Sequence, residues 1–345
     1  MISKLIHLGK RSAIMLGGEI MQSAFHFALS IVLMHALTPN DYGVFAIVLL
    51  MGGLSLTYMR SLVGMPAALL IPPHAGTRRT LPHEVALGSA ALAYAVLIGL
   101  IVALVLHFWL QADAVAGGLF VGLWSLRSSL RSTMFAKNSQ GLASLSDMAF
   151  TASGALLSAV LLTGLPAVDP LQGVFLVLAL ANAIAILAAL LLQRQRPRLT
   201  YRRQRLRHYA RMSRQIAWST AGTTMGNIQA QGQVLLIAAI AGPAAYAPVA
   251  AMLVFFAPLR LVSSALANMI QPELSALTAR GEEKRAAALT RRWTVATGGI
   301  GVVYGLAVAV GMPMLATPIF DGQPRTLIAG LAWCISMAPL LYVMP

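Results

Sequence analysis

Charged residues are scarce in this chain. Asp, Glu, Lys and Arg together make up 10% of its 345 residues, whereas soluble domains usually carry about 25%. Hydrophobic residues make up 58% of the chain, and the mean hydropathy is +0.76. Apolar runs long enough to cross a hydrocarbon core about 30 Å thick recur along the sequence. This composition excludes an ordinary soluble domain and predicts a polytopic membrane protein.

Cysteine is almost absent. The one cysteine, Cys334, lies inside an apolar run, so the sequence offers neither a disulfide framework nor a thiolate metal site. The seven histidines never fall in a metal-ligand spacing, and no nucleotide-binding loop is found. We therefore expect no metal, no cofactor and no direct use of ATP. Despite the net charge of +15, we expect no nucleic-acid partner, because the basic residues stand in loops between apolar runs without an aromatic-basic module.

The apolar runs define ten candidate spans, and their continuous pattern predicts helices, which satisfy their own backbone groups in lipid. The spans are 12–34, 42–71, 85–106, 114–136, 143–164, 170–192, 215–240, 246–272, 293–316 and 325–345. The predicted fold is an all-α, polytopic transmembrane helix bundle. We divide it into an N-terminal lobe of six helices at 1–192, an arginine-rich linker at 193–214, and a C-terminal lobe at 215–345 with about four helices.

Basic residues are distributed unevenly between the loops. Segments 1–11, 72–84, 193–214 and 273–292 contain most of them, whereas the alternate loops 35–41, 107–113, 165–169 and 241–245 contain none. Because basic loops stay on the cytoplasmic side, we expect a cytoplasmic N-terminus and a cytoplasmic linker. The linker is expected to attract anionic lipid head groups. The alternative is a dedicated role in binding a partner protein or substrate.

A short motif occurs twice. The sequences LTPNDYGVFAI and AGPAAYAPVAA align with a constant shift, which places Pro39 over Pro243 and Tyr42 over Tyr246. Each copy joins the first two spans of its lobe, and in each the proline presets a turn. Both copies are expected to face the outside. We therefore predict two pseudo-symmetric lobes related by an axis along the membrane normal.

Three stretches resemble a known family: HALTPNDYGVFAIVLL at 35–50, SLRSSLRSTMFAKNSQGLASLSDMAF at 125–150 and IQPELSALTARGEEKRAAALTRR at 270–292. They are similar to segments of bacterial polysaccharide and lipid-linked oligosaccharide (O-antigen type) flippases, in the multidrug/oligosaccharidyl-lipid/polysaccharide exporter (MOP) superfamily. The resemblance implies two six-helix lobes around a central cavity, with twelve or fourteen spans. We therefore expect the C-terminal lobe of this chain to be incomplete.

The resemblance also implies a function without enzymatic chemistry. It implies a flippase of the bacterial inner membrane that moves an undecaprenyl-type lipid-linked glycan, used for lipopolysaccharide or exopolysaccharide, across the membrane by alternating access. Expected partners are membrane lipids, polysaccharide polymerase and glycosyltransferases. The alternatives are a multidrug antiporter of the same superfamily and a non-transporting membrane component of polysaccharide assembly. A membrane glycosyltransferase is disfavoured, because the outer loops are short and lack a suitable pair of carboxylates.

Arginines inside spans are the candidate substrate-binding residues, since an arginine at a span centre costs about 2.5–3.5 kcal/mol on insertion scales. They are Arg60, Arg127, Arg131 and Arg260. If their faces converge, their guanidinium groups suit the pyrophosphate of a lipid-linked glycan. The alternatives are that Arg131 snorkels to the interface and that Arg260 pairs with an acid. These arginines argue against a site for organic cations, which would favour acids and aromatics.

A second candidate group is polar rather than cationic. Glu19, Gln22 and His26 form one stripe on the first span, at i, i+3 and i+7, and Asp147 opens the fifth span. We consider these residues as candidates for proton or cation coupling. Structural hydrogen bonding between helices is the alternative.

Overall fold

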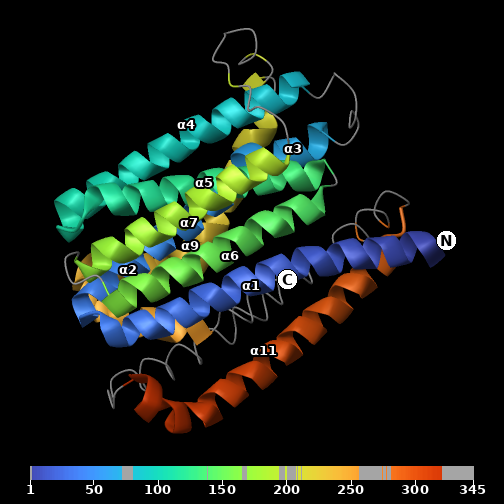
Figure 1. Ribbon diagram of the computed structural model, residues 1–345. Helices are drawn as coiled ribbons and strands as arrows, with labels where there is room; N and C mark the ends of the chain where they lie inside the picture. Colours follow the sequence, from blue (N-terminus) through green and yellow to red (C-terminus); the bar gives the residue numbers. More distant parts are fainter. Residues whose placement is uncertain are drawn as a thin grey trace.

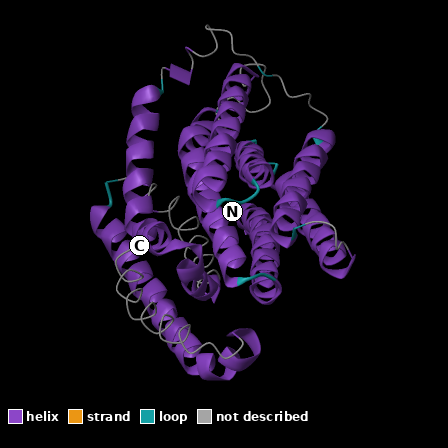
Figure 2. Ribbon diagram, turned by 90° about the vertical axis from the view of Figure 1, so that its left-hand side faces the viewer, coloured by secondary structure: helices purple, strands orange, loops and turns teal. Residues whose placement is uncertain are grey.

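The computed structural model describes residues 2–71, 81–137, 139–164, 169–193, 212–255 and 281–320, together with the single residues 199, 207, 209, 210, 274 and 277. Throughout this part of the chain the regular structure is helical, without strands (Figure 2). The helices are α1 (Ile2–Ala36), α2 (Pro39–Met59), the π-helical turn η1 (Arg60–Gly64), α3 (Met65–Leu70), α4 (Leu81–Val105), the π-helical turn η4 (Leu106–Leu110), α5 (Ala114–Ala136), α6 (Gln140–Gly164), α7 (Pro170–Leu192), α9 (Ser213–Phe255) and α11 (Glu283–Phe320). The tenth candidate span, 325–345, lies outside the described residues.

Five described helices are long and apolar enough to cross a membrane. They are Pro39–Ala68, Pro82–Leu110, Gln140–Thr163, Pro170–Leu192 and Ser213–Val254. Apolar side chains cover the outward face of α4, where Val96, Leu97, Leu100 and Leu104 are exposed, as expected of a helix that faces lipid. The chain is therefore a multi-pass membrane protein.

The N-terminal helices form one packed bundle (Figure 1). In it α4 packs on α5, α5 on α7, α7 on α6 and α6 on α1, while α2 packs between α5 and α9. Aromatic rings fill its interior: Phe120 stacks on Trp124 at 5.3 Å and on Phe175 at 6.3 Å, and Phe175 stacks on Phe45 at 6.2 Å, as measured between ring centroids. These contacts join α2, α5 and α7 in a single apolar core, to which α6 contributes Phe150.

Both copies of the repeated motif start a helix, as the sequence predicted. Thr38 caps α2, since its Oγ1 accepts a hydrogen bond from the backbone N–H of Asp41 at 3.2 Å, and Pro39 is the first helical residue. In α9 the helix is broken at Gly242, whose φ is +80°, and continues from Pro243. Glycine takes this φ without a steric penalty. α9 therefore contains two helical segments joined at the turn that the sequence placed at 241–245.

The two copies also meet in space, which the sequence did not predict. Tyr42 and Tyr246 are buried in the same apolar cluster, and a β-carbon at Gly43 would overlap the backbone carbonyl of Pro243. Near the other end of α2, Ser61 hydrogen-bonds Ser219 at 2.9 Å. α2 and the first segment of α9 therefore run antiparallel in contact along their length.

We expect Gly43→Ala to lower the thermal stability of the detergent-solubilised protein, because the added methyl group would push α2 away from Pro243. Overpacking of this kind typically costs about 1–3 kcal/mol. Gly53→Ala is the matched control on the same helix, since a β-carbon there meets no described atom within 4 Å. Thermal unfolding scans compare the two variants, and equal melting temperatures would contradict the tight contact at Gly43.

Candidate functional site

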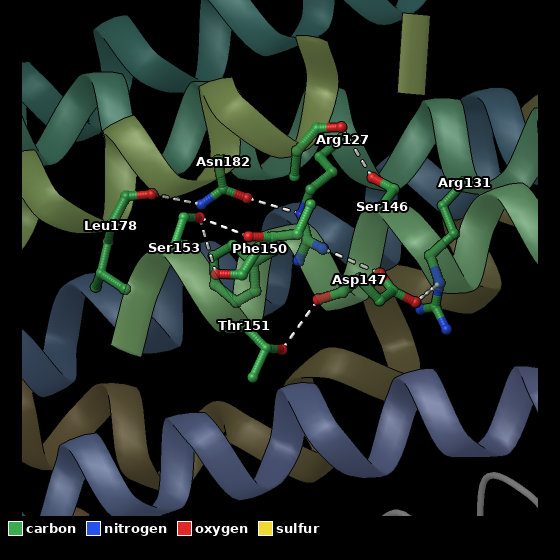
Figure 3. A network of polar contacts seen from close by, with 11 residues as sticks. Arg127, Arg131, Ser146, Asp147, Phe150, Thr151, Ser153, Leu178 and Asn182 are labelled. Carbon is green, nitrogen blue, oxygen red and sulfur yellow. Dashed lines mark hydrogen bonds and ion pairs between the residues drawn. The ribbon is translucent and has the colours of Figure 1, made fainter. Parts of the chain in front are cut away.

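The most concentrated charge inside the bundle is a buried network centred on Asp147 of α6 (Figure 3). One carboxylate oxygen, Oδ1, lies 3.0 Å from Nη1 of Arg127, and the other, Oδ2, lies 3.0 Å from Nε of Arg131. The two arginines are four residues apart on α5 and so lie on one face of that helix. The spacing predicted their common face, and the structure adds the acid that they share.

Arg127 contacts residues of both α6 and α7. Its Nε donates to Oδ1 of Asn182 on α7 at 2.8 Å, and its guanidinium lies over the ring of Phe150, 4.1 Å from the centroid. Asn182 in turn donates from Nδ2 to the backbone carbonyl of Leu178 at 2.8 Å. With a 4% exposed side chain, Arg127 is a buried charge whose hydrogen bonds and counter-ion offset its desolvation. Its position is that of a structural tie between α5, α6 and α7.

Arg131 differs from Arg127 in its access to solvent. Its side chain is 22% exposed, and its guanidinium lies 5.1 Å from the centroid of the Phe135 ring. Because two arginines share the single carboxylate of Asp147, this group of three residues carries an excess positive charge. Arg131 is the more exposed arginine of the group.

The polar stripe of α1 lies against this network. The His26 ring is 5.6 Å from the Phe150 ring and 5.5 Å from the Trp124 ring, between centroids. Gly18 brings the α1 backbone up to Asp147, since a β-carbon there would lie 3.0 Å from Oδ2. Gln22 is half-buried on the same helix, and the side chain of Glu19 lies outside the described part. The structure therefore brings His26 and Asp147 into one region of the bundle.

Arg60 lies at the start of the π-helical turn η1. It is exposed, and it is the first residue of η1 within the candidate span Pro39–Ala68. Gly64 lies between Arg60 and α5. A β-carbon at Gly64 would lie 3.4 Å from Cγ of Arg60 and 3.3 Å from Oγ of Ser132 on α5. Arg60 thus approaches the part of α5 that also carries Arg131. Arg260, the fourth candidate, lies outside the described residues.

Sequence reasoning missed two members of the network. Asn182 is the one amide in the otherwise apolar middle of α7, and an isolated amide in such a span needs a hydrogen-bonding partner. That signal was present in the sequence. Phe150, by contrast, is one of many apolar residues, and nothing in its sequence context distinguishes it. Within the described residues, no group of three or more His, Cys, Asp or Glu is placed to hold a metal ion.

Solved structures with a similar architecture were found by comparison. The chain is similar to a eukaryotic MATE transporter, with 14% identity and a TM-score of 0.63 over 98% of this chain and 79% of that one. It is similar to a multidrug resistance MATE family transporter of the MOP superfamily in an outward-facing conformation, with 15% identity and a TM-score of 0.55 over 97% and 78% of the two chains. A MOP superfamily transporter from Pyrococcus furiosus matches with 13% identity and a TM-score of 0.57 over 96% and 78%.

The chain has the MATE transporter fold. This fold confirms the predicted all-α polytopic bundle. No protein-family model and no curated protein matches the sequence. At these identities the likeness to MATE transporters establishes the architecture alone.

We expect Asp147→Asn to lower the melting temperature in detergent much more than Glu84→Gln does. The first change leaves Arg127 buried without its counter-charge, and breaking a buried pair typically costs about 3–5 kcal/mol. The control removes the Lys137–Glu84 pair, at 2.8 Å, whose side chains are 22% and 20% exposed, and such pairs contribute about 0–1 kcal/mol. Equal shifts in melting temperature would contradict the tie that we assign to Asp147.

Proposed function

We propose that this chain is a flippase-type exporter that moves a lipid-linked polysaccharide precursor across the bacterial inner membrane by alternating access. The observation that carries the proposal is the sign of the charge inside the bundle. Arg60 is exposed within an apolar span, and the Asp147 group carries more arginine than acid. A MATE fold with a cationic interior suits an anionic substrate.

The chemistry of a pyrophosphate-linked glycan fits these two accessible arginines. Guanidinium groups bind phosphate oxygens through paired hydrogen bonds, and both Arg60 and Arg131 have side chains that solvent reaches. The substrate phosphate would compete with Asp147 for Arg131. Arg127 is assigned to positioning, because its hydrogen bonds to Asp147 and Asn182 already occupy it.

The remaining predicted residues have places in this proposal. His26 and Gln22 line α1 beside the network, and Glu19 precedes them on the same helix. Once Arg131 turns to a phosphate, Asp147 still has Arg127 as a partner, and we assign to Asp147 the coupling of substrate binding to a proton or cation. The linker at 193–214 is proposed to lie on the cytoplasmic side, where the glycan precursor and its synthesising enzymes are found.

A multidrug exporter is the second candidate. One similar structure is of a multidrug resistance transporter, and the His26, Trp124 and Phe150 rings next to Asp147 are of the kind that binds organic cations. For the Pyrococcus furiosus transporter, a reversed polarity of the binding pocket suggests a different function. By the same criterion of polarity, the excess of arginine here favours an anionic substrate.

We expect Arg60→Gln and Arg131→Gln to abolish the restoration of surface polysaccharide in a bacterial strain that lacks its own flippase, while the parent chain restores it. Losing a guanidinium removes a charge-assisted contact to phosphate, which is typically worth about 1.5–3 kcal/mol, or roughly 10- to 100-fold in affinity. Surface polysaccharide is measured after the amount of each variant in the membrane fraction has been matched.

Arg292→Gln is the control for the loss of a positive charge, because Arg292 is exposed on α11. It should restore polysaccharide as the parent does. Full restoration by Arg60→Gln and Arg131→Gln would refute the cationic site. Resistance to organic cations, conferred by the parent chain without any restoration of polysaccharide, would favour the multidrug exporter instead.

A further inference from the structure

The contact between α2 and α9 has two halves of opposite chemistry. At the Tyr42 end it is apolar and closed: Tyr42, Tyr246 and Ala238 are 3%, 2% and 1% exposed and belong to the same apolar cluster. Gly43 lies directly against the carbonyl of Pro243 there. Separating the two helices at this end would expose aromatic and alkyl surface to water, which is unfavourable in proportion to its area.

At the Ser61 end the contact consists of side-chain hydrogen bonds. Oγ of Ser61 bonds Oγ of Ser219 at 2.9 Å and Oγ1 of Thr220 at 3.1 Å, Tyr58 donates to Oγ1 of Thr224 at 3.1 Å, and Asn227 donates to Oγ1 of Thr57 at 2.8 Å. Apart from Ser61, these hydroxyl and amide groups are exposed or half-buried. Water can replace each such bond with little net loss, because the separated groups are hydrated as well as they were paired.

A fifth hydrogen bond ties the end of the linker to the same place. Tyr209, just before α9, donates its hydroxyl to the backbone carbonyl of Leu62 at 2.9 Å. Pro66 lies four residues after Leu62 and has no N–H to offer this carbonyl. Tyr209 therefore hydrogen-bonds a backbone carbonyl inside η1, the π-helical turn Arg60–Gly64, and Pro66 cannot donate to that carbonyl.

We propose that the Ser61 end of the α2–α9 contact is a latch that opens during transport, and that the Tyr42 end is the pivot about which it opens. The latch is formed by Thr57, Tyr58 and Ser61 with their partners on α9, and Tyr209 reinforces it at the linker. Opening exchanges hydrogen bonds for water on one side of the membrane and leaves the apolar contact of the two repeated motifs intact. The latch also lies beside Arg60, the exposed first residue of η1, so its opening separates α2 from α9 next to that arginine.

This inference rests on the chain being a transporter of two moving lobes and not on the identity of its substrate. The test therefore needs no substrate. Cys334 is replaced by Ala, and a single cysteine is introduced as Ile216→Cys, at a residue of α9 that is 8% exposed near the latch. The rate of labelling by a membrane-impermeant maleimide is measured separately on inside-out vesicles and on intact cells.

Weakening the latch with Tyr58→Phe and Ser61→Ala together removes three of its hydrogen bonds. We expect labelling of Ile216→Cys to become at least about tenfold faster, since each of the three lost bonds shifts the equilibrium by roughly 2- to 10-fold. The increase should be found only on the side that carries the linker. Monodisperse elution in detergent confirms that each variant is folded.

Two controls separate opening of the latch from general loosening. Thr163→Ala with Ser153→Ala removes two hydroxyls of α6 that bond only to backbone carbonyls of their own helix, and it should leave the labelling rate unchanged. Ala238→Cys reports on the Tyr42 end, and its labelling rate should not rise when the latch is weakened. An unchanged rate at Ile216→Cys in the weakened latch, labelling only from the opposite side, or an equal increase at Ala238→Cys would each overturn the proposal. All three results are independent of whether the chain restores polysaccharide.

Discussion

The charge of Asp147 is the interaction on which the N-terminal bundle depends. A carboxylate this deep in an apolar bundle is tolerated only when it is paired, and here two arginines of α5 pair with it. Asn182 brings α7 into the same network, and Gly18 allows α1 to approach it. A single charge thus fixes the positions of four helices relative to one another. Apolar side chains alone would fix them less specifically, because apolar packing has no preferred direction.

Burial decides what each arginine can do. Arg127 and Arg131 are one helical turn apart and share the same acid, yet Arg127 is enclosed by Asn182 and Phe150, whereas Arg131 is partly open to solvent. An enclosed guanidinium with all its partners in place has nothing left to offer a ligand. In the proposed function, the partly exposed Arg131 exchanges a carboxylate for a phosphate, because both acceptors pair with guanidinium groups in the same way. The network therefore contains one buried arginine and one partly exposed arginine on the same acid.

From the sequence one could predict where the helices begin and end and which side chains share a helix face. The apolar runs gave the helices, Pro39 and Pro243 marked the starts of two of them, and the spacing of Arg127 and Arg131 gave their shared face. The partners across helices could not be predicted, because periodicity states which way a side chain points and not what it meets. Asp147 was identified as a polar residue of its span, but its pairing with both arginines depends on how α5 and α6 pack. The contact of Gly43 with Pro243 could not be predicted either, because it depends on how α2 and α9 pack.

The two ends of α2 show how a membrane bundle can hold together and still move. Lipid offers no hydrophobic force between apolar helices, so contacts in a membrane depend on close packing and on polar groups. Close packing, as at Gly43, is lost steeply with separation and therefore favours a joint that stays closed. Hydroxyl pairs, as at Ser61, are exchanged for water wherever water can enter, and water enters from the membrane surface nearest to them. Because the apolar joint and the hydroxyl pairs stand at opposite ends of the same two helices, we expect the helices to separate first at the Ser61 end, next to Arg60.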